Sequence, residues 1–83
     1  MGVMDWIPKE VRPGRVRLVV QGQEEVLVEQ HRGLISYETD RVMFRTGQGR
    51  VTVQGEGLII SAFGPWDARV EGKIGAVLME EEQ

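Results

Sequence analysis

His31 is the side chain that could serve as a catalytic base or as a metal ligand in this chain, which contains one histidine and no cysteine. A hydroxyl nucleophile needs a base beside it, so Ser36 and Ser61 would both depend on His31 for activation. Neither serine lies in the glycine-flanked turn that presents the nucleophile in many hydrolases. The lack of cysteine also excludes thiol nucleophiles, thiolate metal sites and disulfides. The sequence therefore predicts no catalytic residue and no enzymatic activity.

Metal or phosphate binding would have to use the few polar residues near two turns. Glu29 and His31 would share one face of a strand and could supply two metal ligands, but a stable site needs three or four. We favour a corner histidine whose ring packs against its neighbours or bonds to the backbone. The Gly47-Gln48-Gly49 segment is too short to cradle a phosphate and is predicted to be a hairpin turn. We expect no metal site and no cofactor.

A row of arginines is the feature that could bind nucleic acid, because small β-barrels bind single strands through basic stripes with interleaved aromatic side chains. The net charge is −3, from 10 Lys and Arg against 13 Asp and Glu. This balance opposes phosphate binding and favours cross-strand Arg–Glu pairs, so we expect no nucleic-acid partner. A small β-barrel that binds nucleic acid remains the alternative function. The arginines are Arg15, Arg17, Arg41, Arg45 and Arg50, of which the last three would carry that role.

The elements that must position these side chains are predicted to be strands. From Val16 onward, apolar and polar residues alternate with a period of two, and clusters of glycine or aspartate interrupt the pattern. No segment has a helical period. The expected strands are residues 16–21, 25–29, 34–37, 41–45, 50–54, 58–62, 68–74 and 76–79. The predicted fold class is all-β: a small antiparallel β-sandwich or roll of about seven or eight short strands.

The 83 residues give room for one compact domain. Residues 16–79 form the predicted β domain, and residues 80–83 form an acidic tail. Residues 1–15, with Pro8 and Pro13, are predicted to be an extended segment that either covers a sheet edge or reaches a partner, and we favour the covering role. No apolar run approaches the ~20 residues of a membrane span, and no secretion signal is recognisable, so we expect a soluble, unexported protein.

Five apolar residues fall on the face of their strands that alternation assigns to solvent. One interpretation is that they are isolated on the surface or covered by the N-terminal segment. The functional interpretation is a patch used for self-association or for binding a partner, and the pattern alone does not place the five side by side. The candidate contact residues are Val19, Leu27, Met43, Ile59 and Phe63.

Most of the chain resembles the YabP/YqfC family of small sporulation proteins, and the YqfC branch in particular. The resemblance rests on the order and spacing of several short motifs. These are the turn at Gly22, residues 28–33 followed by residues 34–37, Gly55 with residues 58–60, and residues 70–74. Pro8 and Pro13 also stand where members of that branch carry prolines. The chain differs from the pattern in having Gln30 before the histidine and Gly64-Pro65-Trp66 in a turn that is usually more charged.

The resemblance implies a non-enzymatic protein of endospore-forming bacteria that contributes to spore-envelope formation. It would act in the cytoplasm of the mother cell, peripheral to the outer forespore membrane. Family members are encoded beside an integral membrane protein, which implies a complex with that protein. The surplus apolar residues are consistent with such a partner or with a homo-oligomer. No catalytic residue is carried over from the family.

Overall fold

The computed structural model describes residues 15–81, which form one antiparallel sheet of six strands in the order β1-β2-β6-β5-β4-β3. Residues 1–14 of the predicted N-terminal segment, and Glu82 and Gln83 of the predicted acidic tail, lie outside the described residues. The strands are β1 Arg17–Gln21, β2 Glu25–Glu29, β3 His31–Glu38, β4 Arg41–Thr46, β5 Gly49–Phe63 and β6 Asp67–Glu81.

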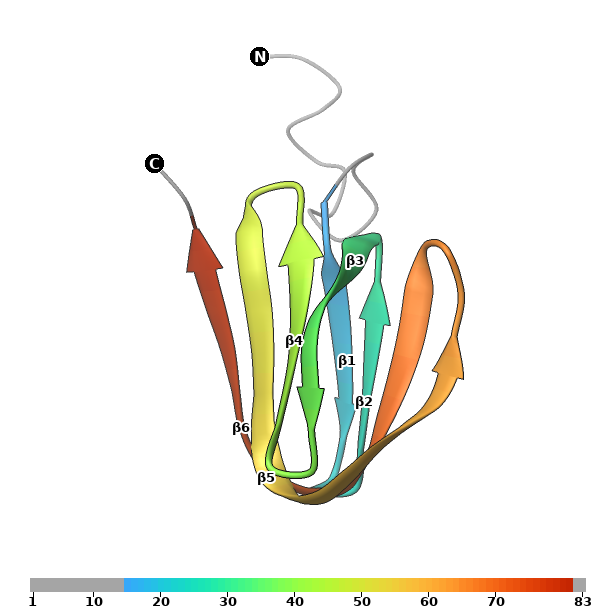
Figure 1. Cartoon of the computed structure of the whole chain (residues 1–83), viewed down its shortest axis with the longest axis vertical. Coiled ribbons are helices and arrows are strands. Elements are labelled where there is room, and N and C mark those ends of the chain that lie inside the picture. Colours follow the sequence, from blue (N-terminus) through green and yellow to red (C-terminus); the bar gives the residue numbers. More distant parts are fainter. Residues whose placement is uncertain (1–14, 82–83) are drawn as a thin grey trace.

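The sheet folds over on itself because its two central strands are long and bent (Figure 1). The first half of β5 pairs with β4, the first half of β6 pairs with β2, and the two long strands pair with each other along both halves. One layer therefore contains β3, β4, residues 49–54 and residues 76–81. The other contains β1, β2, residues 67–74 and residues 58–63. This arrangement confirms the predicted antiparallel sandwich or roll.

The strand count is six rather than seven or eight, because two predicted interruptions are bends within single strands. Residues 55–57 were expected to form a turn, but β5 continues through them, and β6 continues through Gly75. Glycine is required here by close approach: Gly72 has a φ of 143°, and an added Cβ would lie 2.7 Å from the carbonyl oxygen of Gly57. A Cβ on Gly55 would overlap the carbonyl oxygen of Lys73. These glycines allow the long strands to cross closely at the fold.

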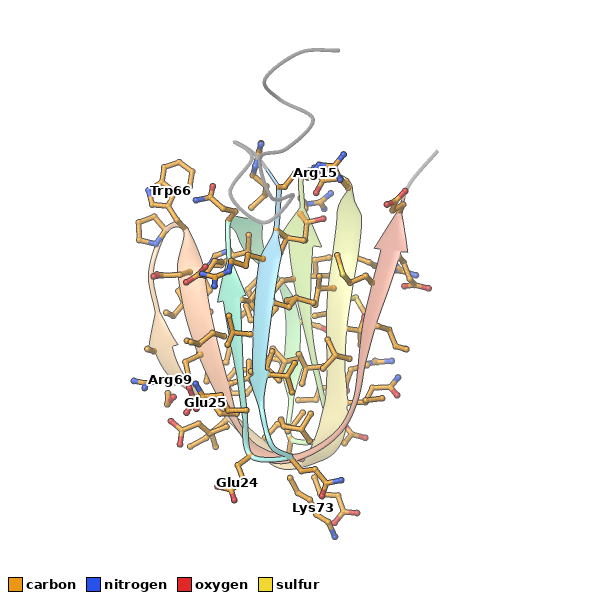
Figure 2. All side chains as sticks on the ribbon, turned by 180° about the vertical axis from the view of Figure 1, so that it is seen from behind. Arg15, Glu24, Glu25, Trp66, Arg69 and Lys73 are labelled. Carbon is orange, nitrogen blue, oxygen red and sulfur yellow. The ribbon has the colours of Figure 1, made fainter. Side chains whose placement is uncertain are left out.

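The hairpin turns beside the bend hold it in place. Four backbone N–H groups at the bend donate to carbonyl oxygens of the β1–β2 and β3–β4 turns, so their hydrogen bonds are kept where the ladder is irregular. Glu24 of one turn and Lys73 of the bend project at this same end of the molecule (Figure 2). The bonds run from Gly55 to Asp40 (3.0 Å), from Leu58 to Thr39 (2.8 Å), from Gly72 to Glu24 (3.1 Å) and from Ile74 to Gln23 (2.8 Å).

The core lies between the two layers and is formed by the side chains that alternation assigns to the inner face. Valine predominates among them because β-branched side chains pack well on a pleated surface. Val16, Leu18, Ile60 and Val77 are partly buried against this cluster. The buried cluster is Val26, Val28, Val42, Phe44, Val53, Leu58, Ala68, Val70 and Ile74.

Candidate interaction surfaces

His31 begins β3 and is 1% exposed. The backbone N–H of Gly33 donates to its Nδ1 atom at 3.0 Å, so Nδ1 carries no hydrogen and the ring proton is on Nε2. Nε2 in turn donates to the carbonyl oxygen of Gly64 at 3.1 Å. Both ring nitrogens therefore bind the backbone, as predicted for a corner histidine. The Glu29 carboxylate, its proposed partner in metal binding, instead accepts a hydrogen bond from Arg17 at 3.1 Å.

The His31 ring also connects the core to the surface. Its centroid lies 5.3 Å from that of Phe44, which is fully buried, and 5.2 Å from that of Phe63, which is 55% exposed. The planes of His31 and Phe63 are inclined by 28°, a stacked arrangement. A ring that packs against two aromatic side chains and is hydrogen-bonded at both nitrogens has a structural role.

The hairpin tip between β5 and β6 is fixed to the corner between β2 and β3. The carbonyl oxygen of Trp66 accepts backbone hydrogen bonds from Gln30 at 2.6 Å and from His31 at 3.1 Å. Gln30 has a φ of 67°, and within residues 15–81 no other residue besides glycine has a positive φ. The Trp66 side chain is 62% exposed and projects from the tip (Figure 2). The backbone of the tip is therefore tied down while its indole faces solvent.

Three exposed aromatic residues come from segments that bond to one another on one side of the sandwich: Tyr37 of β3, Phe63 at the end of β5, and Trp66 of the tip that follows. We call them the aromatic edge. Tyr37 accepts a hydrogen bond from the backbone N–H of Ile60 at 3.0 Å, which links the two layers along this side. Exposed aromatic residues are enriched at protein interfaces because they bury a large area at low entropic cost. The arrangement is suited to contact with another protein.

Phe63 reaches this side because of a β-bulge. The register with β6 shifts between Ile60 and Ala62, so that Phe63 pairs with the buried Ala68 and points inward onto His31. Strict alternation predicts Phe63 on the outer face with Ile59, and Ala62 on the inner face. The structure corrects both, because the inserted residue reverses the alternation beyond it.

The other predicted contact residues lie in separate places. Val19 and Leu27 are half-buried neighbours across β1 and β2, on the outer face of the second layer. Ile59 is 53% exposed on the second half of β5, opposite Glu71. Met43 is half-buried on the outer face of the first layer, opposite Thr52. The five candidates therefore do not form one patch.

Tyr37 and Trp66 are not among the five contact residues predicted from the sequence. The signal for Trp66 was its place directly after Pro65 in a turn, where a large side chain has no strand neighbour to cover it. Tyr37 gave no such signal, because its inward direction follows from a register irregularity between Leu34 and Ser36 that only the pairing with β4 reveals.

The predicted cross-strand Arg–Glu pairs are confirmed, because three ion pairs join residues that stand directly opposite in the sheet. Two of the arginines that the nucleic-acid alternative would use, Arg41 and Arg50, belong to such pairs. β6 runs through Glu80 and Glu81, so these residues of the predicted acidic tail are part of the sheet. The pairs are Arg17–Glu29 (3.1 Å), Arg41–Glu38 (3.5 Å) and Arg50–Glu80 (2.6 Å).

Together these features define a two-layer, all-β domain with an aromatic edge. The chain belongs to the YabP family, whose model matches residues 12–83. It is also 30% identical over 71 residues to the uncharacterized protein YqfC of Bacillus subtilis (strain 168). The aligned residues cover 86% of this chain and 76% of that protein. The resemblance found in the sequence is therefore confirmed. No solved structure shows significant similarity to the chain. In residues 15–81 there is no helix with the length and apolar character of a membrane span.

Proposed function

We propose that this protein is a sporulation protein that acts by protein–protein contact, as an assembly factor in spore-envelope formation, and has no catalytic activity. Membership of the YabP family supports a role related to sporulation. A non-enzymatic role is supported by His31, because both nitrogens of the chain's single histidine are engaged within the fold. The observation that carries the proposal is the aromatic edge, where Tyr37, Phe63 and Trp66 are 47%, 55% and 62% exposed.

The proposed partner is an integral membrane sporulation protein at the outer forespore membrane, with this chain bound peripherally from the mother-cell cytoplasm. The contact would centre on Trp66 and Phe63, at the end of β5 and in the tip that follows it. Aromatic anchors at a rigid site carry much of the binding energy of an interface. The site is rigid here because the Trp66 carbonyl binds two backbone N–H groups and Phe63 stacks on a buried ring.

The experiment that tests this proposal is localisation of a fluorescent fusion in sporulating cells, with and without the membrane protein encoded beside it. We expect a shell around the forespore that becomes diffuse in the absence of the membrane protein. A signal that is diffuse in both strains would contradict the envelope role.

Variants then test the aromatic edge itself. Trp66→Ser should make the shell diffuse, because it removes the exposed indole and leaves the backbone hydrogen bonds of the tip intact. Leu78→Ser is the matched control, since Leu78 is 44% exposed on the outer face of the first layer, in the half of β6 that does not adjoin the tip. Circular dichroism melts of both purified variants establish that they are folded. A shell that persists with folded Trp66→Ser would exclude Trp66 as a contact.

A further inference from the structure

Among the strands of residues 15–81, β1 lies at one end of the sheet order and pairs only with β2. Natural proteins protect such edges with bulges, charges or proline, because an unprotected edge pairs with other strands. β1 has none of these along its middle: Leu18, Val19 and Val20 are apolar, and its register with β2 is uninterrupted from Arg17 to Gln21.

The other edges formed by residues 15–81 are protected. β3 has two register irregularities, and the second half of β5 has two more. The backbone N–H of Ile60 on β5 is already bonded to the hydroxyl of Tyr37. The second half of β6 ends in Glu80 and Glu81. Among these edges, β1 is therefore the one suited to accept another strand.

In the part of the chain that the structure describes, most of the side chains that line the space beside β1 are apolar. A depression of about 630 Å³ is lined by residues 15–20 and Met79, and Arg15 marks its upper end in Figure 2. Val20 and Met79 are 50% and 57% exposed although their register partners, Val26 and Val51, are fully buried. Both side chains thus face the gap between the layers on this side of the sandwich. A strand added beside β1 would extend the second layer across that gap and cover them.

We propose that the added strand is β1 of a second copy of this chain, paired antiparallel about a twofold axis at Val19. This register places Leu18 opposite Val20 of the second copy on the inner face, and Arg17 opposite Gln21 of the second copy on the outer face. No like charges meet, whereas a parallel pairing in register would place the two Arg17 side chains side by side. A twofold axis also makes the interface closed, so the product is a dimer and not a fibre.

The same register gives Val19 and Leu27 a common role. Val19 and Leu27 are direct neighbours on the outer face, so two copies would form a continuous apolar row of four side chains, two from each copy. These residues are half-buried in the single chain and would be further covered in the dimer. The dimer goes beyond the proposed sporulation function and does not depend on it.

The first test is the mass of the purified full-length chain in solution, with variants at the proposed axis. Light scattering at protein concentrations raised to about 100 μM should give the mass of a dimer, which is twice the 9.4 kDa mass of one chain. Val19→Lys and Val19→Glu should each weaken the dimer at least tenfold, because like charges would meet on the axis, and an equimolar mixture should restore it. Leu78→Lys is the control and should remain dimeric. A monomeric wild type, or a dimer unaffected by Val19→Lys, would overturn the proposal.

A disulfide test does not require the charged variants to fold. Opposed residues of an antiparallel pair have Cα atoms about 4.5–5.5 Å apart, within the range of a disulfide. The chain has no native cysteine, so Val19→Cys introduces a single thiol. Mild oxidation should convert most of Val19→Cys into a covalent dimer and leave Leu78→Cys mainly monomeric. Equal cross-linking of the two variants would exclude the twofold axis at Val19.

Discussion

The Nε2 atom of His31 lies 3.1 Å from the carbonyl oxygen of Gly64, 33 positions further along the chain. The same ring accepts a hydrogen bond from the backbone N–H of Gly33 at Nδ1 and packs against Phe44 and Phe63. One side chain thus joins the start of β3, the end of β5 and the buried face of β4. The hairpin tip that carries Trp66 is held against the same corner by two further backbone hydrogen bonds.

We expect His31→Ala to lower the free energy of unfolding by about 3 kcal/mol, because it removes a buried ring and two hydrogen bonds. His31→Phe keeps a ring of similar size but leaves the Gly33 N–H and the Gly64 carbonyl without partners, at a cost of about 1–3 kcal/mol. Urea unfolding of both variants separates packing from hydrogen bonding. Arg32→Ala, at an exposed neighbouring position, is the control and should change stability by no more than about 0.5 kcal/mol. Wild-type stability in His31→Phe would show that the two hydrogen bonds contribute nothing.

We expect Gly72→Ala to destabilise the fold more than Gly22→Ala. Both residues have positive φ, 143° and 58°, so both substitutions strain the backbone, by about 1–2 kcal/mol at a left-handed position. At Gly22 an added Cβ meets nothing within 4 Å, whereas at Gly72 it would lie 2.7 Å from the Gly57 carbonyl oxygen. Thermal melts of the two variants compare strain alone with strain plus overlap. Equal losses would mean that the close crossing of β5 and β6 relaxes without cost.

The core of this fold could be predicted from the sequence because its signal is local. Alternation along each short strand determines which side chains face inward, and Val26, Val28, Val42 and Phe44 are buried as expected. The bend could not be predicted in the same way. A glycine cluster such as residues 55–57 is compatible with either a turn or a kinked strand. The outcome depends on β6, which continues alongside and supplies hydrogen bonds on both sides of the bend.

The candidate site was only partly predictable for a related reason. The role of His31 followed from the general behaviour of a lone histidine at a corner. The side on which Phe63 lies depends on a one-residue bulge, and a bulge has no reliable signature in a single sequence. The aromatic edge brings together residues from β3 and from the far end of β5, which is a property of the folded sheet and not of either segment.

We expect Tyr37→Phe to open the aromatic edge locally with little effect on global stability. The substitution removes the acceptor for the Ile60 N–H at a side chain that is 47% exposed, so the loss should be below about 1 kcal/mol. Hydrogen exchange measured by NMR should show faster exchange of the Ile60 amide, while the amide of Val53 in the first half of β5 is unchanged. An unchanged exchange rate at Ile60 would mean that water replaces the hydroxyl as an equal partner.

The Arg50–Glu80 pair should contribute little to stability despite its short contact of 2.6 Å. Both side chains are about half exposed, at 51% and 53%, so solvent screens their attraction and holding them in one geometry costs side-chain entropy. A double-mutant cycle with Arg50→Gln and Glu80→Gln should give a coupling energy below about 1 kcal/mol at low salt, and less as salt is raised. The cycle is needed because Arg50→Gln alone also removes other contacts of this arginine. A coupling that is larger and insensitive to salt would show that the pair is shielded from water by the strands around it.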